Sequence, residues 1–517
     1  MWVLGTARGT ASDRRREPSR VAPRRARASA LALAVALAAA ACARPGATPA
    51  PGAAPEAAAS AAAAPAPAAA PSVLRVGTSG DYAPFSHADP DAPDGLAGFD
   101  VELARRFAAE RGVRIAWVRF RWPALADDLR AGRFDVALGG VTVRPERSAL
   151  GRFTRPLAEA GAVLLVREGA GPASLEAVDA LGPRARLAVN AGGHLERAAR
   201  ARFPKAQLVA VPDNAAVPGL LARGAVDACV SDAIEAPRWL AGLPGARALG
   251  PFTRDRKAWW VRADLPALAR ELDAWLAARE ADGTLARLRR ARLGVAGAPA
   301  SAAPLPALLS ALRERLELMP LVAEAKRGTR APVEDRAREA RVLDDAVAAA
   351  RAAARARGVA APPDAAVRAL FRAQIEAAKA VQAAVLAAPP VPGHPGLDLD
   401  AALRPALTRL GERIAELLVE LPGGLSEAAI RSGVDAELAL PGVPDAPRRA
   451  LADALVQAAG ARRARPGAAR QPSPSSRRMA ARCSSSAGAG ARSAGSGTPA
   501  SFTGLPAIGL PPACTIM

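Results

Sequence analysis

The sequence predicts an α/β module over residues 73–294 followed by an all-α module over residues 308–460. Short apolar runs alternate with amphipathic stretches in the first region, which is typical of α/β folds with largely parallel sheets. Only helical periodicity is found in the second region, which indicates a helix bundle. Between them, VAGAPASAAPLPA (295–307) has the composition of a linker.

The first 42 residues have the pattern of an export signal. In PRRARASALALAVALAAAACARPG (23–46), a basic stretch precedes an apolar stretch and then small residues. The apolar stretch is too short to span a bilayer. Ala39-Ala40-Ala41-Cys42 resembles a lipobox, with Ala39 in place of the usual Leu. We therefore expect either lipidation of Cys42 or ordinary cleavage near the Ala run, and both export the protein. Residues 43–72 are rich in Ala and Pro and are expected to form a flexible tether.

The net charge of +21 lies mostly at the two ends of the chain, and the middle carries only +6. A nucleic-acid-binding protein concentrates its charge on a folded face, so we expect no nucleic-acid partner. The tail, residues 461–517, is rich in Arg, Ser, Gly and Ala and is expected to be disordered. Neither the four Cys residues nor the three His residues have metal-ligand spacing, so the sequence predicts no metal site.

Two acids follow an apolar strand in the segment VDACVSDAIEA (226–236). Asp232 and Glu235 stand three residues apart at the end of the predicted strand. One acid is enough to hold the ammonium group of a ligand. A second acid in the same place suggests that something is also protonated, because a carboxyl group in an apolar site keeps its proton more readily.

Three phrases in order resemble the periplasmic amino-acid-binding proteins: LRVGTSGDYAPFS (74–86), GFDVELARRFA (98–108) and FDVALGGVTVRPERS (134–148). The resemblance implies two α/β lobes joined by a hinge, with the chain crossing near 167 and returning near 255. The opening GDY-PFS, the phrase VN-GG, PDN and DAIEA together resemble one branch of that family, the cyclohexadienyl dehydratases. Such enzymes convert prephenate or arogenate to an aromatic product by loss of CO2 and water, without a cofactor.

The resemblance also implies roles for single residues. Glu235 would be the general acid, and Arg147, Lys257 and the Gly-Gly turn would pair the substrate carboxylates. Asp232 would hold the ammonium group of arogenate or orient other groups. The further residues implied are Asp81, Trp122, Thr142, Asn190, Gly192, Gly193 and His194. His194 departs from the family pattern, because the family usually has Thr at this position. Trp122 is equally compatible with an ordinary core position.

Charged residues recur in the helical module within RERLELMPLVAEAKRGTRAPVEDRAREARV (313–342). Arg315 and Lys326 are eleven residues apart, or about three helical turns, so they share a face if the helix is continuous. Pro320 is able to bend that helix. The next helix is expected to begin with Asp335, Arg338 and Glu339. Buried cations are costly unless they receive an anion, and the alternative is a surface of salt bridges.

The spacing of these residues resembles the all-helical chorismate mutases, and most closely their exported gamma type. The resemblance implies that Arg315, Lys326, Arg338 and Arg413 surround the chorismate carboxylates and ether bridge. It places Gln382 at the ether oxygen and Glu339 at the substrate hydroxyl, with Asp335 nearby. Ala378 stands where a hydroxyl residue is common. The rearrangement to prephenate needs neither a nucleophile nor a cofactor, only a compact conformer and donors to the ether oxygen. Lys326 and Gln382 are the expected donors.

The two halves together predict an exported bifunctional enzyme. The helical half would convert chorismate to prephenate, and the α/β half would convert prephenate to phenylpyruvate, arogenate to phenylalanine, or both. The only membrane contact would be a lipid anchor at Cys42. The alternatives are an amino-acid or carboxylate receptor fused to a mutase, and a structural protein whose helices form a homodimer.

Overall fold

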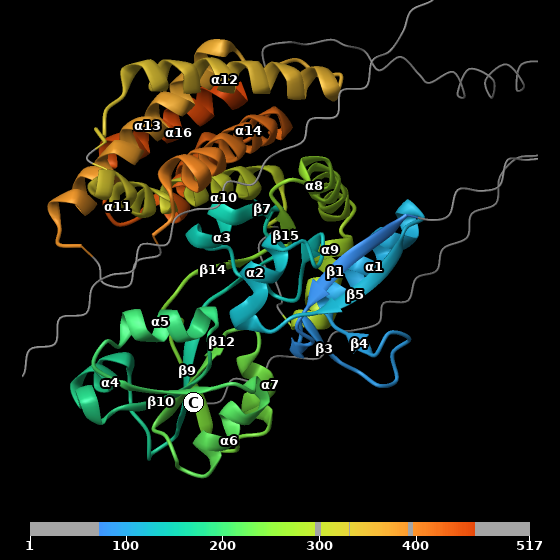
Figure 1. The fold of residues 1–517 in the computed structure, drawn as a ribbon, viewed down its shortest axis with the longest axis vertical. Helices are drawn as coiled ribbons and strands as arrows, with labels where there is room; N and C mark the ends of the chain where they lie inside the picture. The colour runs from blue at the N-terminus through green and yellow to red at the C-terminus, as the bar shows by residue number, and fades with distance from the viewer. Residues whose placement is uncertain (1–71, 295–300, 330, 391–395, 461–517) are drawn as a thin grey trace, which may run out of the picture. The chain divides into compact units, whose positions relative to one another are not determined.

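The computed structural model describes residues 72–294, 301–329, 331–390 and 396–460 (Figure 1). The predicted export signal with its lipobox, the tail and nearly all of the tether lie outside these residues. Within them, no helix has both the length and the apolar character that crossing a membrane requires. The predicted class is confirmed, because a two-lobed α/β region precedes a helical region.

The first lobe is built on a five-stranded sheet to which both ends of the α/β region contribute. Its strand order is β5-β1-β6-β15-β7. The strands are β1 (Val73–Thr78), β5 (Arg114–Arg119), β6 (Val136–Ala137), β7 (Gly151–Phe153) and β15 (Trp260–Arg262). A smaller sheet contains β2 (Asp81–Tyr82), β3 (Ser86–Ala88) and β4 (Leu96–Ala97). The helical segments are α1 (Phe99–Arg111), η1 (Trp122–Ala124), α2 (Leu125–Arg130), α3 (Pro145–Leu150), α8 (Pro266–Ala281), α9 (Thr284–Leu288) and η4 (Arg289–Leu293).

The second lobe has a sheet of the same size, in the order β11-β10-β12-β9-β13. The strands are β9 (Ala162–Arg167), β10 (Arg186–Asn190), β11 (Gln207–Val211), β12 (Ala228–Asp232) and β13 (Ala246–Leu249). The helical segments are α4 (Leu175–Leu181), η2 (Gly182–Arg184), α5 (His194–Arg202), η3 (Asn214–Ala216), α6 (Val217–Ala222) and α7 (Ala236–Ala241). Two apolar clusters occur in each lobe, so both lobes bury large hydrophobic surfaces.

The sheets are mixed rather than largely parallel, which corrects the prediction. The strands β5, β1 and β6 run parallel, as do β11, β10 and β12, whereas β15, β7, β9 and β13 pair antiparallel. The reason is the hinge, formed by the antiparallel pair β8 (Ala158–Ala160) and β14 (Asp255–Lys257). The strand that enters each lobe from the hinge therefore runs antiparallel to a strand of the βα units in that lobe: β9 to β12, and β15 to β6. The crossing lies at 158–161 instead of near 167, because 162–167 already belong to β9.

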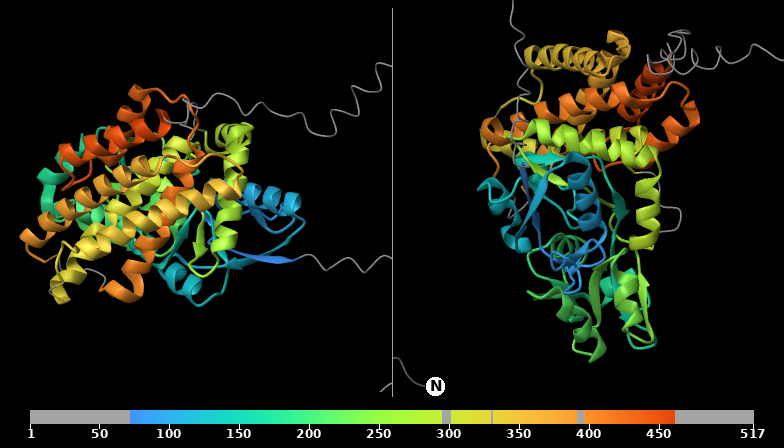
Figure 2. Two further views of the ribbon diagram at one scale, coloured as in Figure 1. Left: turned by 90° about the horizontal axis from the view of Figure 1, so that it is seen from above. Right: turned by 90° about the vertical axis from the view of Figure 1, so that its right-hand side faces the viewer.

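The helical region packs around one large apolar cluster. Its segments are α10 (Pro304–Glu317), α11 (Met319–Thr329), α12 (Arg336–Ala356), α13 (Asp364–Ala387), η5 (Leu399–Leu403), α14 (Arg404–Glu420), α15 (Glu427–Leu438) and α16 (Asp445–Gly460). The long helix α12 packs against both α13 and α14 (Figure 2). The expected continuous helix through Arg315 and Lys326 is interrupted at Leu318, so these residues lie on two helices. Pro320 falls in the first turn of α11, where a missing N–H costs little.

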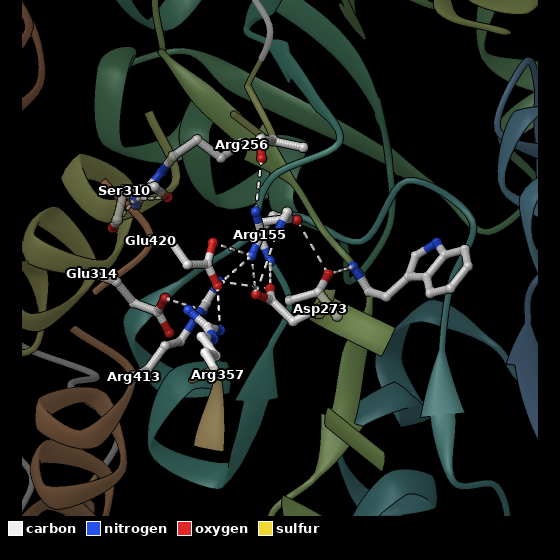
Figure 3. A network of polar contacts seen from close by, with 11 residues as sticks. Arg155, Arg256, Asp273, Ser310, Glu314, Arg357, Arg413 and Glu420 are labelled. Carbon is white, nitrogen blue, oxygen red and sulfur yellow. Dashed lines mark hydrogen bonds and ion pairs between the residues drawn. The ribbon is translucent and has the colours of Figure 1, made fainter. Parts of the chain in front are cut away.

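A buried polar network joins the helical region to the first lobe (Figure 3). Arg155 is fully buried, and its Nη2 atom lies 2.6 Å from Asp273 of α8 and 3.0 Å from Glu420 of α14. Arg256 on the hinge strand β14 donates to the carbonyl oxygen of Ser310 at 2.7 Å. Buried charges are costly unless paired, so these contacts favour one arrangement of α10 and α14 on the lobe. Ala149 of α3 belongs to the apolar cluster of the helical region.

Candidate functional sites

The two acids of the second lobe lie at the carboxyl end of β12. Asp232 is the last residue of that strand and is fully buried, and Glu235 lies in the turn that leads into α7. β12 lies between β10 and β9 inside its sheet, which explains why both acids are removed from solvent. The end of a central strand facing a neighbouring lobe is a common place for ligand sites in α/β proteins.

Lys257 connects residues of both lobes from the hinge strand β14. Its Nζ atom lies 2.9 Å from Asp232 of the second lobe. It also lies 3.0 Å from the hydroxyl oxygen of Thr142 and 3.2 Å from that of Tyr82, both in the first lobe. The ammonium group is buried and satisfied, and Asp232 has its second oxygen bound to the backbone N–H of Ile234 at 2.9 Å.

The carboxyl group of Glu235 has an unusually high pKa. Burial, followed by the nearby charge of Asp232, raises the pKa of Glu235 to about 8. Hydrogen bonds from Ser231 and Asn214, at 3.1 and 2.8 Å, and the charge of Lys257 act in the opposite direction. A carboxyl group with this pKa is largely protonated at neutral pH and is able to donate a proton.

Arg147 lies on α3 with its guanidinium group buried. Nη1 donates to the carbonyl oxygen of Thr142 at 2.9 Å, and the group lies 6.0 Å from the ring of Trp260. Burial, together with the neighbouring charge of Arg144, holds the pKa of Arg147 well below its usual range. Among the described residues no carboxylate forms an ion pair with Arg147. A buried cation of this kind is suited to receive the carboxylate of a ligand.

The phrase VN-GG spans the end of β10 and the turn that leads into α5, as predicted. Asn190 donates to the carbonyl oxygens of Val211 and Pro212, and Gly193 is the N-cap residue of α5. His194 is the first residue of that helix, and its Nε2 atom lies 2.8 Å from Asp255 on the hinge. His194 therefore connects the second lobe to the hinge.

These residues line one cavity of about 40 Å³ between the lobes. Of the predicted residues, Trp122, Thr142, Arg147, Asn190, Gly193, His194, Glu235 and Lys257 line it. Asp232 does not line the cavity, but its carboxylate pairs with Lys257, which does. Gly192 and Asp81 do not line it: the backbone N–H of Gly192 donates to Glu196 at 2.7 Å, and Asp81 accepts a hydrogen bond from Trp122 at 3.1 Å.

Four lining residues were not predicted: Tyr82, Gly140, Leu195 and Asn214. Tyr82 and Asn214 stand inside the phrases GDY and PDN, so the signal was present in the sequence. Burial and the charges of Asp232 and Glu235 raise the pKa of Tyr82 well above its usual range, so its hydroxyl group stays protonated. Trp122 packs edge-on against Tyr82, which makes it a wall of the cavity.

The second candidate site lies among α10, α11, α12, α13 and α14. Arg315 of α10 is buried and donates to Gln374 at 3.2 Å, but its Nε atom has no partner among the described residues. Burial lowers the pKa of Arg315 to about 10. Gln382 of α13 is also buried, and its Oε1 atom likewise has no partner there. A buried donor and a buried acceptor left open in this way indicate a place for a polar ligand.

Three further cations act on one another at this end of the bundle. Burial, and then the charges of Arg404 and Arg338, lower the pKa of Lys326. Burial and the charge of Arg404 likewise lower the pKa of Arg338. Lys326 donates to the carbonyl oxygen of Val333 at 3.2 Å. The positive charges of the three groups repel one another, and a bound anion would reduce this repulsion.

The predicted acids lie at the start of α12. Asp335 is the N-cap residue and accepts from the backbone N–H of Arg338 at 3.0 Å. Glu339 lies 3.4 Å from Lys379 of α13. Both residues therefore shape the end of the bundle at which Lys326 and Arg338 lie.

Arg413 does not join this group of cations. Its guanidinium group lies 3.5 Å from Glu314 and 3.5 Å from Asp273, in the network that joins the helical region to the first lobe (Figure 3). The late arginine near Lys326 and Arg338 is instead Arg404, the first residue of α14. Nine residues correspond to two and a half helical turns, so Arg404 and Arg413 lie on opposite faces of α14.

Comparisons with known proteins match two segments of the chain to family models. Residues 74–294 match the bacterial extracellular solute-binding proteins, family 3, and residues 306–383 match chorismate mutase type II. A cyclohexadienyl dehydratase of Pseudomonas aeruginosa is 36% identical over 218 residues, which are 41% of this chain and 80% of that protein. A probable amino-acid ABC transporter-binding protein of Haemophilus influenzae is 29% identical over 218 residues, or 42% of this chain and 82% of the relative. A solved ancestral amino acid-binding protein, described as a precursor of cyclohexadienyl dehydratase, is 30% identical with a TM-score of 0.40, covering 43% and 95% of the two chains.

Proposed function

Because the chain belongs to the bacterial extracellular solute-binding proteins, family 3, and has a cyclohexadienyl dehydratase among its relatives, we propose that its α/β region dehydrates prephenate. The helical region, which matches chorismate mutase type II, supplies that prephenate from chorismate. The chain is thus a bifunctional enzyme of phenylalanine biosynthesis. The observation that carries the dehydratase half is a buried carboxyl group, Glu235, whose pKa of about 8 keeps it protonated beside a cavity with two cations.

The dehydration follows from this arrangement. Arg147 pairs with one carboxylate of prephenate, and Lys257, whose ammonium group stays bonded to Asp232, Thr142 and Tyr82, attracts the other carboxylate through its positive charge. Glu235 gives its proton to the ring hydroxyl, the C–O bond breaks, and water leaves. The electrons of the bond to the ring carboxylate then complete the aromatic ring, and CO2 departs. Solvent returns the proton to Glu235. The hydroxyl group of Tyr82, kept protonated, is an additional donor inside the cavity.

The pairing of Asp232 supports prephenate as the substrate over arogenate, and an enzyme over a receptor. In a receptor of this kind, Asp232 would be free for the ammonium group of an amino acid. Here its carboxylate lies 2.9 Å from Lys257 and is already neutralised. A ligand ammonium group would have to displace a buried lysine, which is costly. Prephenate has a keto group in place of that ammonium group.

The mutase half uses the cations at the end of the bundle. Arg315, Arg338 and Arg404 bind the two carboxylates of chorismate. Lys326 donates to the ether oxygen, on which negative charge grows in the transition state. Gln382 joins it as a donor once its amide nitrogen, which bonds to the carbonyl oxygen of Ala378 at 3.1 Å, turns toward the substrate. Glu339 accepts from the substrate hydroxyl. The position of Arg404 near Lys326, seen in the lowered pKa of Lys326, supports its place in this set.

The family implies that the protein works outside the cytoplasm. We further propose that Cys42 carries a lipid anchor, that the folded regions extend over residues 73–294 and 308–460, and that the helical region forms a homodimer. Mass spectrometry of the exported protein tests the anchor, because a diacylated Cys42 at the mature N-terminus has a defined mass. Light scattering of the purified protein tests the dimer.

The dehydratase assignment is tested by supplying prephenate to the wild-type protein and to Glu235→Gln. The wild type is expected to form phenylpyruvate, and the variant is expected to bind prephenate with similar affinity but to lose turnover about 1,000-fold or more. Lys326→Ala serves as the control, because it removes the mutase reaction and leaves dehydration of added prephenate intact. Full turnover by Glu235→Gln would refute the role of this residue.

A further inference from the structure

The hinge strand β14 has two different faces. Side chains alternate between the two sides of an extended strand. Asp255 and Lys257 face the lobes, because Asp255 lies 2.8 Å from Nε2 of His194 and Lys257 lines the cavity between the lobes. Arg256 of the strand and Arg254, which directly precedes it, contact the helical region instead. One short segment of chain therefore connects the dehydratase cavity to the helices.

Arg256 is held by helix α10. Its side chain is 5% exposed, Nη1 donates to the carbonyl and hydroxyl oxygens of Ser310 at 2.7 and 2.9 Å, and Nη2 forms an ion pair with Glu317. Figure 3 shows the side chain running from its strand toward Ser310. Ser310 and Glu317 are seven residues apart, or two helical turns, so they lie on one face of α10. Contacts at both ends of this face fix the direction of the guanidinium group.

Arg254 provides a second attachment, to α15. Its Nη1 atom donates to the carbonyl oxygen of Ala436 at 2.8 Å, and its Nη2 atom forms an ion pair with Glu437. Arg313 of α10 lies 2.6 Å from Glu317 and 3.3 Å from Glu437, so the two attachments share one set of ion pairs. Each of these arginines has a carboxylate partner, so the set holds the segment in place and is not suited to a further anion.

The ammonium group of Lys257 depends on the position of this strand. It has partners in both lobes, with Asp232 at 2.9 Å on one side and Thr142 at 3.0 Å on the other. β14 pairs over three residues with the other hinge strand, β8, and the backbone N–H of Val143 donates to the carbonyl oxygen of Arg256. Hinge segments absorb the backbone changes when two lobes move, and a ladder this short resists such changes weakly. The helices α10 and α15 are a firmer support, because both belong to the large apolar cluster of the helical region.

We propose that the helical region holds the hinge strand in place, and that Arg256 is a positioning residue for the dehydration. It acts through Lys257, whose ammonium group it keeps between the two lobes. The inference rests on the proposed function, because it takes Lys257 as the group that attracts a carboxylate of prephenate. Arg256 itself contacts α10 and touches neither the substrate nor the reacting atoms. The helical region thus has a second role besides the mutase reaction.

The test uses Arg256→Met in the full chain, with prephenate as the added substrate. Glu317 keeps Arg313 as a partner in this variant, so its carboxylate is not left unpaired. The KM for prephenate is expected to rise about tenfold, as for the loss of one charge-assisted contact with the substrate. The descending limb of the pH–rate profile is expected to move to higher pH, because the charge of Lys257 lowers the pKa of Glu235 and is less effective from a displaced position. Arg256→Lys is expected to restore part of both effects.

Arg413→Met is the matched control. Arg413 also joins the helical region to the first lobe, but its ion pairs, with Asp273 and Glu314 at 3.5 Å each, lie outside both hinge strands. Its replacement is expected to lower the melting temperature without changing the KM for prephenate or the pH–rate profile. Equal changes in both variants would overturn the inference, because the effect would then be a general loosening between the two regions.

An Arg256→Met protein that folds with an unchanged KM and an unchanged pH–rate profile would also overturn the inference. If Arg256→Met does not fold, Arg256→Gln, which is still able to donate to Ser310, decides in the same way. If the wild type does not turn over prephenate, the proposed function fails separately. Hydrogen exchange of residues 254–260, followed by mass spectrometry, then tests the attachment. Exchange about tenfold faster in Arg256→Met than in Arg413→Met is expected, and equal rates would refute the attachment.

Discussion

Replacing Glu235 by glutamine should stabilise the protein at neutral pH while removing dehydration. The pKa of about 8 means that the folded state favours the protonated carboxyl group, whereas the unfolded chain has the ordinary value of 4.5. Stability from this group is therefore fully present below about pH 4.5 and is lost as pH rises toward 8. Glutamine is neutral at every pH, and its amide can bond with Asn214 and Ser231.

The size of the effect follows from the difference between the two pKa values. A pH of 7 lies about 2.5 units above the pKa of 4.5 in the unfolded chain, so the free energy of unfolding of Glu235→Gln should exceed that of the wild type by about 3 kcal/mol at this pH. The assay is the free energy of unfolding in urea, measured for both proteins between pH 4.5 and 8.5. The difference should be near zero at the acid end and should grow with pH.

Glu176→Gln is the matched control. Glu176 lies in the same lobe, is fully exposed to solvent, and has a lowered pKa. The same chemical change there should give no stabilisation that grows with pH. If Glu235→Gln were less stable than the wild type at pH 7, or if the difference did not change with pH, the assignment of Glu235 as a buried neutral acid would be wrong.

Three other predictions concern both sites. The kcat for prephenate should fall as pH rises through about 8, because Glu235 must be protonated, and a pH–rate profile that stays flat to pH 9.5 would contradict this. Arg404→Ala should lower kcat/KM for chorismate about tenfold or more. Arg413→Ala should change the stability of the protein but not its kcat/KM. Equal losses of kcat/KM in both variants would show that Arg413 also belongs to the mutase site. Lys257→Met should destabilise the protein by about 3 to 5 kcal/mol in urea unfolding, because it leaves the Asp232 carboxylate buried without its partner, and the additional change Asp232→Asn should restore most of that loss.

Several residues of the site between the lobes could be predicted because they stand in short phrases at the ends of strands. Asp232 ends β12, Glu235 follows it, and Asn190 ends β10, so the local phrases and their resemblance to the family were enough. Asp81 was placed in the cavity by the same reasoning, but its side chain bonds to Trp122 instead. Which side a loop residue faces depends on packing that a single phrase does not contain.

The direction in which Arg413 points could not be predicted, because the rotation of α14 about its own axis depends on packing against distant segments. The structure begins α14 at Arg404, directly after the π-helical turn η5, and Arg413 on the opposite face of that helix lies near Glu314 and Asp273. Contacts across long chain separations were equally out of reach. Arg155 and Glu420 are 265 residues apart, and neither lies in a recognisable motif.

The most direct test of the bifunctional assignment is to add chorismate to the purified protein and to follow the products by mass spectrometry over time. The account predicts that chorismate is consumed and that phenylpyruvate forms by way of prephenate. Prephenate that accumulates without further conversion would contradict the dehydratase assignment and would leave a mutase joined to a receptor. Chorismate that remains unchanged would contradict the mutase assignment.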